Sequence, residues 1–261
     1  MSRFSRIVWQ GKSHYCLAKE NQCLLLEGDP FGEWKETGQR VPWEEAQFLS
    51  PVETCQLLAI GINYSQHAEE SGSSLPDAPV LFIKASSALT GHEQDILLPA
   101  MAPNEVDYEA ELAVVIGREA QAISLEQAPE VILGYTCGND VSARDCQLRL
   151  DKQWARGKSF DTFAPLGPWI ETELDPSDLR IRSLLNGQVM QDARTSDMIF
   201  DCMELVSYLS HCMTLNPGCV IMTGTPSGVG FARKPPIFLK EGDVIEVDIE
   251  GIGTLRNPVR K

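Results

Sequence analysis

The alternation of apolar and polar residues along this chain predicts many short strands and few helices. In residues 107–117, polar and apolar side chains alternate before a run of Val and Ile, which is typical of a β-strand. Apolar runs that end in polar or glycine-containing turns predict further strands at 57–62, 80–84 and 131–140. Residues 243–255 alternate apolar with polar, largely acidic, positions, which predicts a hairpin with one face in water.

Helical patterns are fewer and shorter than strand patterns. Residues 203–215 carry apolar side chains at helical spacing, residues 125–130 follow Ser124 as a candidate N-cap, and residues 142–154 are compatible with a helix. These segments do not alternate regularly with strands, which argues against a doubly wound α/β sheet or a (β/α)₈ barrel. We therefore expect an α+β fold that is rich in β-structure.

The first 55 residues differ in texture from the rest of the chain. Short apolar runs at 7–9 and 24–26 alternate with turn residues such as those at 28–32, and no catalytic constellation is visible. A chain of 261 residues has room for one large domain and a small appendage. We expect a small β-rich domain at 1–55, with a role in packing or dimer support, and a catalytic domain at 56–261.

Charge and composition exclude several classes of function. The chain has 22 basic and 37 acidic residues, a net charge of −15, which argues against nucleic-acid binding. Its beginning does not resemble a signal peptide, and no stretch approaches the roughly 20 apolar residues that span a bilayer. We expect a cytoplasmic protein that does not bind membranes. None of the eight cysteines forms a C-x-x-C pair, so we expect reduced, buried thiols rather than a zinc ribbon.

Three acidic residues form the most informative candidate site. Glu109 and Glu111 share one face of the strand predicted at 107–117, and a third acid, Asp140, stands at the turn after another strand. Neighbouring carboxylates on a half-buried sheet must be protonated, paired with Lys or Arg, or bound to a cation. An all-oxygen set suits Mg²⁺ or Mn²⁺, with Ca²⁺ also compatible, whereas Zn²⁺ usually recruits nitrogen or sulfur. The alternative is a solvated acidic face.

Other segments carry residues suited to acid–base chemistry. His67 and Glu70 are three residues apart on a predicted helical turn, where a carboxylate can orient an imidazole as a general base. Lys158 could stabilise a substrate carboxylate or a developing enolate. The glycine-rich turn at 223–230 could hold an anionic oxygen through its backbone N–H groups. The alternatives are a surface histidine, a surface lysine and an ordinary tight turn, and Arg144 and Asp145 suit a structural ion pair.

Taken in order, these segments resemble the fumarylacetoacetate hydrolase family. The resemblance covers about residues 57 to 261, and its motifs are short but jointly specific. The matching residues are Gly61-Ile62-Asn63-Tyr64 with His67, Asp107-Tyr108-Glu109-Ala110-Glu111-Leu112, Asn139-Asp140-Val141-Ser142-Ala143-Arg144-Asp145, Gly157-Lys158-Ser159-Phe160, Asn186-Gly187-Gln188, Thr223-Gly224-Thr225-Pro226 and the segment Gly251 to Val259.

The resemblance implies a mixed β-sandwich roll, a homodimer, and a Mg²⁺ or Mn²⁺ ion without an organic cofactor. It also implies roles for individual residues. These are metal ligation by Glu109, Glu111 and Asp140; catalysis by His67 with Glu70 as its partner, as in the small acylpyruvate hydrolases, and by Lys158; and substrate contacts from Gln147 and Thr225. In larger members the partner of the histidine lies in a C-terminal segment that this chain lacks, which argues against fumarylacetoacetate itself as substrate.

These roles predict hydrolysis of a C–C bond in a small 2,4-dioxo acid. His67, aligned by Glu70, would deprotonate a water that attacks the distal carbonyl, and Lys158 would stabilise the departing enolate beside the cation. Two alternatives use the same site without water attack: isomerisation of the 2-hydroxyhepta-2,4-diene-1,7-dioate type, and decarboxylation of oxaloacetate. A third alternative is a non-catalytic metal-binding scaffold. The sequence does not identify the acyl group of the substrate.

Overall fold

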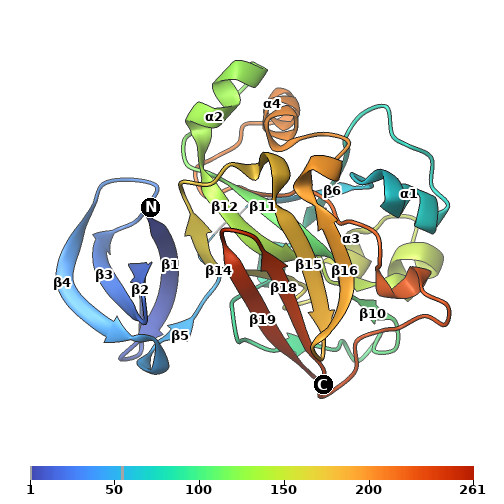
Figure 1. The fold of residues 1–261 in the computed structure, drawn as a ribbon, viewed down its shortest axis with the longest axis horizontal. Coiled ribbons are helices and arrows are strands. Elements are labelled where there is room, and N and C mark those ends of the chain that lie inside the picture. Colours follow the sequence, from blue (N-terminus) through green and yellow to red (C-terminus); the bar gives the residue numbers. More distant parts are fainter. Residues whose placement is uncertain (1, 54–55) are drawn as a thin grey trace.

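The computed structural model describes residues 2–53 and 56–261, and within them strands dominate (Figure 1). The first strands form an antiparallel lobe at one end of the molecule, in blue in Figure 1, and they are β1 (Arg3–Trp9), β2 (Lys12–Lys19), β3 (Gln22–Gly28), β4 (Trp34–Pro42) and β5 (Gln47–Phe48). The domain boundary was predicted between residues 55 and 56. It adjoins residues 54–55, which lie outside the described residues.

The lobe joins the main sheet through β1, which pairs with β14. The order of the described strands across this sheet is β4-β3-β2-β1-β14-β12-β11-β17-β6-β7, with β8 beside β14. The strands beyond the lobe are β6 (Leu57–Gly61), β7 (Val80–Lys84), β8 (Leu89–Thr90), β11 (Ala110–Ile116), β12 (Ile132–Asn139), β14 (Ala164–Glu171) and β17 (Val220–Met222).

A second, five-stranded sheet packs against the main one and completes the sandwich. Its described order is β16-β15-β18-β19-β9, and its strands are β9 (Ile96–Leu97), β15 (Arg180–Leu185), β16 (Gln188–Arg194), β18 (Val244–Ile249) and β19 (Gly253–Arg260). The hairpin predicted at 243–255 is β18 and β19. The predicted α+β, β-rich sandwich fold is confirmed.

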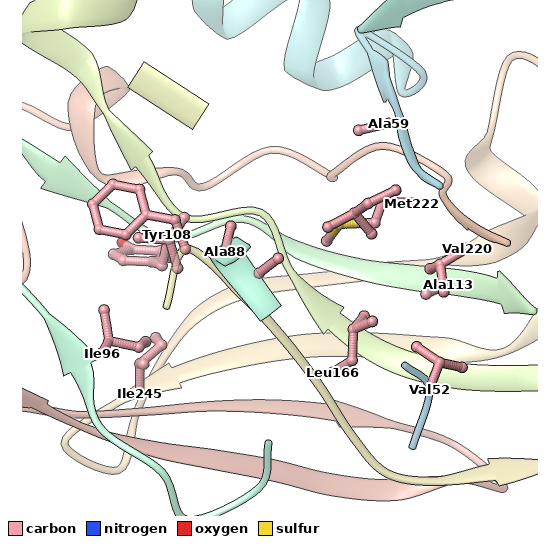
Figure 2. Close-up of a cluster of buried hydrophobic side chains, with 14 of the residues drawn as sticks. Val52, Ala59, Ala88, Ile96, Tyr108, Ala113, Leu166, Val220, Met222 and Ile245 are labelled. Atoms are coloured by element: carbon pink, nitrogen blue, oxygen red, sulfur yellow. The ribbon is translucent and has the colours of Figure 1, made fainter. Parts of the chain in front are cut away.

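Both faces of the main sheet are covered at its centre, so β11 is buried along its whole length. Leu112 and Val114 on one face pack with apolar residues of β15, β18 and α4, whereas Ala113 and Val115 belong to a second core cluster. Figure 2 shows this second cluster, in which Ala113, Leu166 and Met222 from the main sheet are drawn with side chains of other elements. The central strands therefore form a rigid frame for residues at their ends.

Helical segments are short and lie at the sheet ends and connections. The α-helices are α1 (Ser65–Ser71), α2 (Ala128–Val131), α3 (Ala155–Lys158) and α4 (Cys202–Cys212), with a π-helical turn at Cys146–Leu150. Shorter 3₁₀ turns occur at Trp43–Glu45, Ser86–Ala88, Leu125–Gln127, Pro176–Asp178, Thr195–Asp197 and Gly230–Ala232. None of the helices in the described part of the chain has the length and apolar character needed to cross a bilayer.

Two elements differ from the sequence-based expectation. The segment 107–117 is not one strand, because β10 (Val106–Asp107) pairs with β13 (Ser142–Ala143) and β11 begins only at Ala110. The break arises where the Glu109 N–H donates to the Asn139 side chain at 3.0 Å. The helix expected at 142–154 is replaced by β13 and the π-helical turn, whose first N–H is capped by the Asp145 carboxylate at 2.7 Å.

Most of the described cysteines are buried, as expected for small apolar side chains. All the described cysteines except Cys212 are buried. Cys55 lies outside the described residues.

Candidate functional site

The three predicted acidic residues converge at one end of the main sheet. Glu109, Glu111 and Asp140 are buried, and each offers a carboxylate oxygen within 4.8 Å of the others. Because β11 and β12 are antiparallel neighbours, the start of β11 lies beside the end of β12, with Ala110 opposite Asn139. The Asp140 N–H donates to the Glu109 carbonyl at 2.9 Å and extends this pairing by one residue.

Buried cations neutralise two of the three acids. Lys158 Nζ lies 2.5 Å from both Glu109 Oε2 and Asp140 Oδ2, and so bridges them. Lys84 forms a second ion pair with Asp140, and Arg144 Nη2 lies 2.7 Å from Glu109 Oε1. These groups are nearly inaccessible to solvent, so their attraction is weakly screened.

Glu111 has no such partner among the described residues. Its carboxylate accepts a hydrogen bond from the Gly224 N–H at 2.8 Å, and no Lys or Arg of the described chain lies within ion-pair distance of it. Burial, together with the nearby charges of Asp140 and Glu109, raises the pKa of Glu111 well above its usual value. A divalent cation at the three oxygens would supply the positive charge that Glu111 lacks, so the donor set fits Mg²⁺ or Mn²⁺.

The two other carboxylates respond differently to burial. For Glu109, burial favours the neutral form, but the charges of Lys158 and Arg144 outweigh it and lower the pKa well below the usual range. For Asp140, burial prevails over Lys158 and Lys84, and the pKa is raised. The burial of Lys84 lowers its own pKa despite the adjacent Asp140. Since Arg144 also pairs with Asp107, three buried cations face the three acids Glu109, Asp140 and Asp107, and Glu111 is the acid without a cation partner among the described residues.

His67 and Glu70 form the predicted pair on α1. His67 Nδ1 lies 2.8 Å from Glu70 Oε1, and the imidazole lines the same cavity as the three acids. The Gly228 N–H donates to both Glu70 oxygens, at 3.0 and 2.9 Å, which fixes the carboxylate. Since Glu70 engages Nδ1, the ring nitrogen available for proton transfer is Nε2.

The glycine-rich turn does hold anionic oxygens, and they belong to the protein itself. Backbone N–H groups of residues 224–231 donate to three separate carboxylates. The donor–acceptor pairs are Gly224 to Glu111, Gly228 to Glu70, and Gly230 and Phe231 to Asp107. One loop thus orients an acid of the candidate metal site, the carboxylate that contacts His67 and the acid that pairs with Arg144.

Gln147 and Thr225, the predicted substrate contacts, both line the cavity. Gln147 Oε1 accepts a hydrogen bond from Arg144 Nη1 at 2.8 Å, which leaves its amide N–H₂ for another partner. The Thr225 hydroxyl donates to the Ala110 carbonyl at 2.9 Å and accepts from Gln191 Nε2 at 2.7 Å. Their contacts with substrate stay predictions.

Two buried residues around the site, Lys84 and Gln191, were not singled out from the sequence, and Arg144 was expected only in a structural ion pair. Lys84 had one available signal, a charged residue at the end of a predicted apolar strand. Arg144 pairs with Asp107 at 2.9 Å and with Glu109, rather than with Asp145. Gln191 bridges the Ala110 N–H and Thr225, and no local pattern marks it.

Comparison with known proteins identifies the family to which the chain belongs. The family model described as fumarylacetoacetate (FAA) hydrolase C-terminal matches residues 56–260. The chain belongs to the fumarylacetoacetate hydrolase family. A second model, described as Rv2993c-like, N-terminal, matches residues 2–51 of this family member.

Relatives of this fumarylacetoacetate hydrolase family member carry several names. A fumarylacetoacetate hydrolase domain-containing protein 2 homolog from Dictyostelium discoideum is 48% identical over 85% of this chain and 77% of its own length. Oxaloacetate tautomerase FAHD2A from Bos taurus is 44% identical over 84% of this chain and 71% of its own length. The crystal structure of 2-hydroxyhepta-2,4-diene-1,7-dioate isomerase from Mycobacterium marinum is 42% identical, with a TM-score of 0.89 over 100% of this chain and 98% of that one.

Proposed function

We propose that this protein is a divalent-cation-dependent enzyme that moves a proton at the carbon next to the 2-oxo group of a small 2-oxo acid. The reaction is keto–enol tautomerisation of an acid of the oxaloacetate class. The observation that carries the proposal is the His67–Glu70 pair, whose imidazole lines the same cavity as the acidic triad. Relatives named as an oxaloacetate tautomerase and a dienedioate isomerase support proton transfer as the reaction type.

The acidic triad is the proposed binding site for the cation. Glu109, Glu111 and Asp140 would hold Mg²⁺ or Mn²⁺, with Ca²⁺ as a weaker candidate because it prefers more ligands. When bound, the cation supplies positive charge at the 2-oxo and carboxylate oxygens of the substrate, which stabilises an enolate.

The remaining roles fall to side chains of this chain. His67 removes the proton from carbon through Nε2, and the imidazolium that forms is stabilised by the Glu70 carboxylate at Nδ1. The same imidazolium returns the proton to the enolate oxygen or carbon, which completes the exchange. The Lys158 ammonium adds a positive charge beside the enolate, because it lies within the triad at Glu109 and Asp140.

Hydrolysis of a C–C bond in a 2,4-dioxo acid is the second candidate. It is favoured by the same His67–Glu70 pair, since a histidine oriented by a carboxylate can deprotonate water as well as carbon. In that reaction the hydroxide attacks the distal carbonyl, the C–C bond breaks, and the electron pair leaves as the enolate of a 2-oxo acid.

The test measures both reactions with the same preparation. The enol form of oxaloacetate is added to protein with Mg²⁺ or Mn²⁺, and the loss of enol absorbance is followed against metal alone. We expect acceleration that EDTA abolishes and that His67→Ala reduces by about 100-fold or more, the usual contribution of a general base. Glu69→Gln, an exposed neighbour of Glu70 on α1, is the matched control and leaves the rate unchanged.

The choice between the two candidates follows from the products. Tautomerisation of oxaloacetate releases nothing, whereas hydrolysis of acetylpyruvate releases pyruvate and acetate. Pyruvate from acetylpyruvate, without acceleration of enol loss, would replace the proposed reaction with hydrolysis. If the metal-loaded protein shows neither activity, a non-catalytic metal-binding scaffold is favoured.

A further inference from the structure

The cavity that holds the acidic triad is lined by charged and by apolar side chains. The charged or titratable ones are Glu109, Glu111, Asp140, Lys158, Arg144 and His67. Phe82, Trp154 and Ile62 are among the apolar ones. Charged groups suffice for the carboxylate and 2-oxo end of a substrate, so the apolar lining is available for its far substituent.

Trp154 is wedged against the strands behind it. Its ring meets that of Phe82 edge-on, with centroids 5.5 Å apart and an interplanar angle of 76°. On another side, a Cβ added to Gly61 would lie only 2.6 Å from Trp154 Cζ3 and 3.0 Å from Cη2. The indole therefore uses the space that the missing side chain of Gly61 leaves, and it has no room to withdraw toward β6.

The backbone of Trp154 is also connected to Lys158, through a single turn of helix. The Trp154 carbonyl accepts a hydrogen bond from the Lys158 N–H at 3.0 Å, at the start of α3. Lys158 Nζ bridges Glu109 and Asp140 and also lies 5.1 Å from the centroid of the Phe82 ring. The contacts thus run from the triad to Lys158, from Lys158 to Phe82, and from Phe82 to Trp154.

We infer that Trp154 is a specificity-determining residue that limits the length of the far substituent and so selects short 2-oxo acids. The inference rests on the proposed function and adds a size limit to its substrate class. A longer substituent would collide with an indole that Gly61 and Phe82 hold in place, and forcing extra methylenes into a packed site is unfavourable. Because a tryptophan side chain has few rotatable bonds, it cannot easily move aside for a longer substituent.

Binding of non-reacting analogues tests the inference without catalysis. Oxamate and N-butyl oxamate share the chelating end of a 2-oxo acid and differ only in the far substituent. Isothermal calorimetry with the Mg²⁺-loaded full chain gives a Kd for each. We expect wild-type protein to bind N-butyl oxamate at least tenfold more weakly than oxamate, and Trp154→Ala to tighten N-butyl oxamate by about tenfold or more, since single methylenes change recognition by that order.

Two further variants test whether a change in the Kd of N-butyl oxamate comes from the size of the side chain at position 154. Trp154→Phe keeps an aromatic ring at the position and gives a smaller gain for N-butyl oxamate. Trp34→Ala makes the same substitution in β4 of the N-terminal lobe, outside the cavity lining, and leaves both Kd values unchanged.

The outcomes separate the two proposals. If wild-type protein binds oxamate and the ratio of the two Kd values in Trp154→Ala equals the ratio in wild-type protein, the size limit is wrong and the proposed function stands. If Mg²⁺-loaded wild-type protein does not bind oxamate at all, the proposed function fails and the size limit fails with it.

Discussion

Among single residues, Glu111 is the buried acid of the site that has no cation partner among the described residues. Lys158, Lys84 and Arg144 compensate Glu109 and Asp140, while Glu111 has only a hydrogen bond from the Gly224 N–H and no ion pair among the described residues. A buried carboxylate without a counter-charge is costly, and this cost gives Glu111 measurable effects on stability and on cation binding.

The first prediction concerns stability in the absence of cations. The folded-state pKa of Glu111 is raised because burial, then the charges of Asp140 and Glu109, oppose its ionisation. Its contribution to the free energy of unfolding is therefore lost as pH rises from the unfolded pKa toward the folded one. Urea unfolding in EDTA should show that Glu111→Gln removes this slope and raises the free energy of unfolding at pH 8 by about 1–3 kcal/mol.

The control for this prediction is a solvent-exposed glutamate of the same protein. Glu69→Gln should leave the pH dependence unchanged, because Glu69 is exposed. Saturating Mg²⁺ should stabilise wild-type protein and not Glu111→Gln. A wild-type protein that stays more stable than Glu111→Gln in EDTA, from the unfolded-state pKa of Glu111 up to pH 8, would contradict the assignment of Glu111 as the uncompensated acid.

The second prediction concerns protons released on cation binding. Because the pKa of Glu111 is raised, part of the cation-free protein carries a proton there that a bound cation displaces. Calorimetry with Mg²⁺ in buffers of different ionisation enthalpy should detect proton release, and the affinity should fall as pH is lowered. Mg²⁺ binding without proton release from pH 6 to pH 8 would contradict it.

At the scale of elements, the loop at residues 223–231 fixes several carboxylates of the site through its backbone N–H groups. Its N–H groups reach the carboxylates of Glu111 in β11, Asp107 in β10 and Glu70 in α1. Gly228 has a φ of +106°, and an added Cβ would lie 2.3 Å from the Met190 carbonyl oxygen. The loop can therefore reach Glu70 only with glycine at this position.

The third prediction follows from that close approach. Gly228→Ala should displace the loop, release Glu70 and lower kcat by about tenfold or more, since the general base loses its orientation. Mg²⁺ affinity should change far less, because Glu111 is held by Gly224. Gly187→Ala is the matched control, with a φ of +79° and no atom within 4 Å of the added Cβ. An equal loss of activity in both variants would assign the effect to backbone strain alone.

What the sequence could predict at this scale was local. Alternation placed Glu109 and Glu111 near one another, and the end of an apolar run placed Asp140 at a strand terminus. The break at Glu109 was not predictable, because it depends on the Asn139 side chain of the neighbouring strand. Lys84 and Gln191 join the site only through tertiary packing, which no local pattern encodes.

At the scale of the whole molecule, the N-terminal lobe is joined to the main sheet by a short strand pairing. Arg3 lies opposite Glu171 and Phe4 opposite Ile170, and the Ser5 hydroxyl donates to the Pro168 carbonyl at 2.7 Å. Arg3 Nε lies 2.8 Å from Glu171 Oε2, and the Glu171 side chain is fully buried whereas that of Arg3 is 37% exposed.

The fourth prediction tests that junction. Arg3→Met keeps the length of the side chain but leaves Glu171 buried without its cation, which should lower the free energy of unfolding by about 1–3 kcal/mol. Activity should be unchanged, because neither residue lines the cavity. Arg180→Met is the control, since the Arg180–Asp192 pair is exposed and such pairs contribute at most about 1 kcal/mol. Equal destabilisation by the two substitutions, measured by urea unfolding, would contradict the prediction.

The ammonium of Lys158 that spans Glu109 and Asp140 has a consequence for how the centre fills. If a cation binds the triad as proposed, it would have to displace this ammonium from the two carboxylates, so loading would be an exchange of partners and not a simple addition. Without a cation, the ammonium holds Glu109 and Asp140 together.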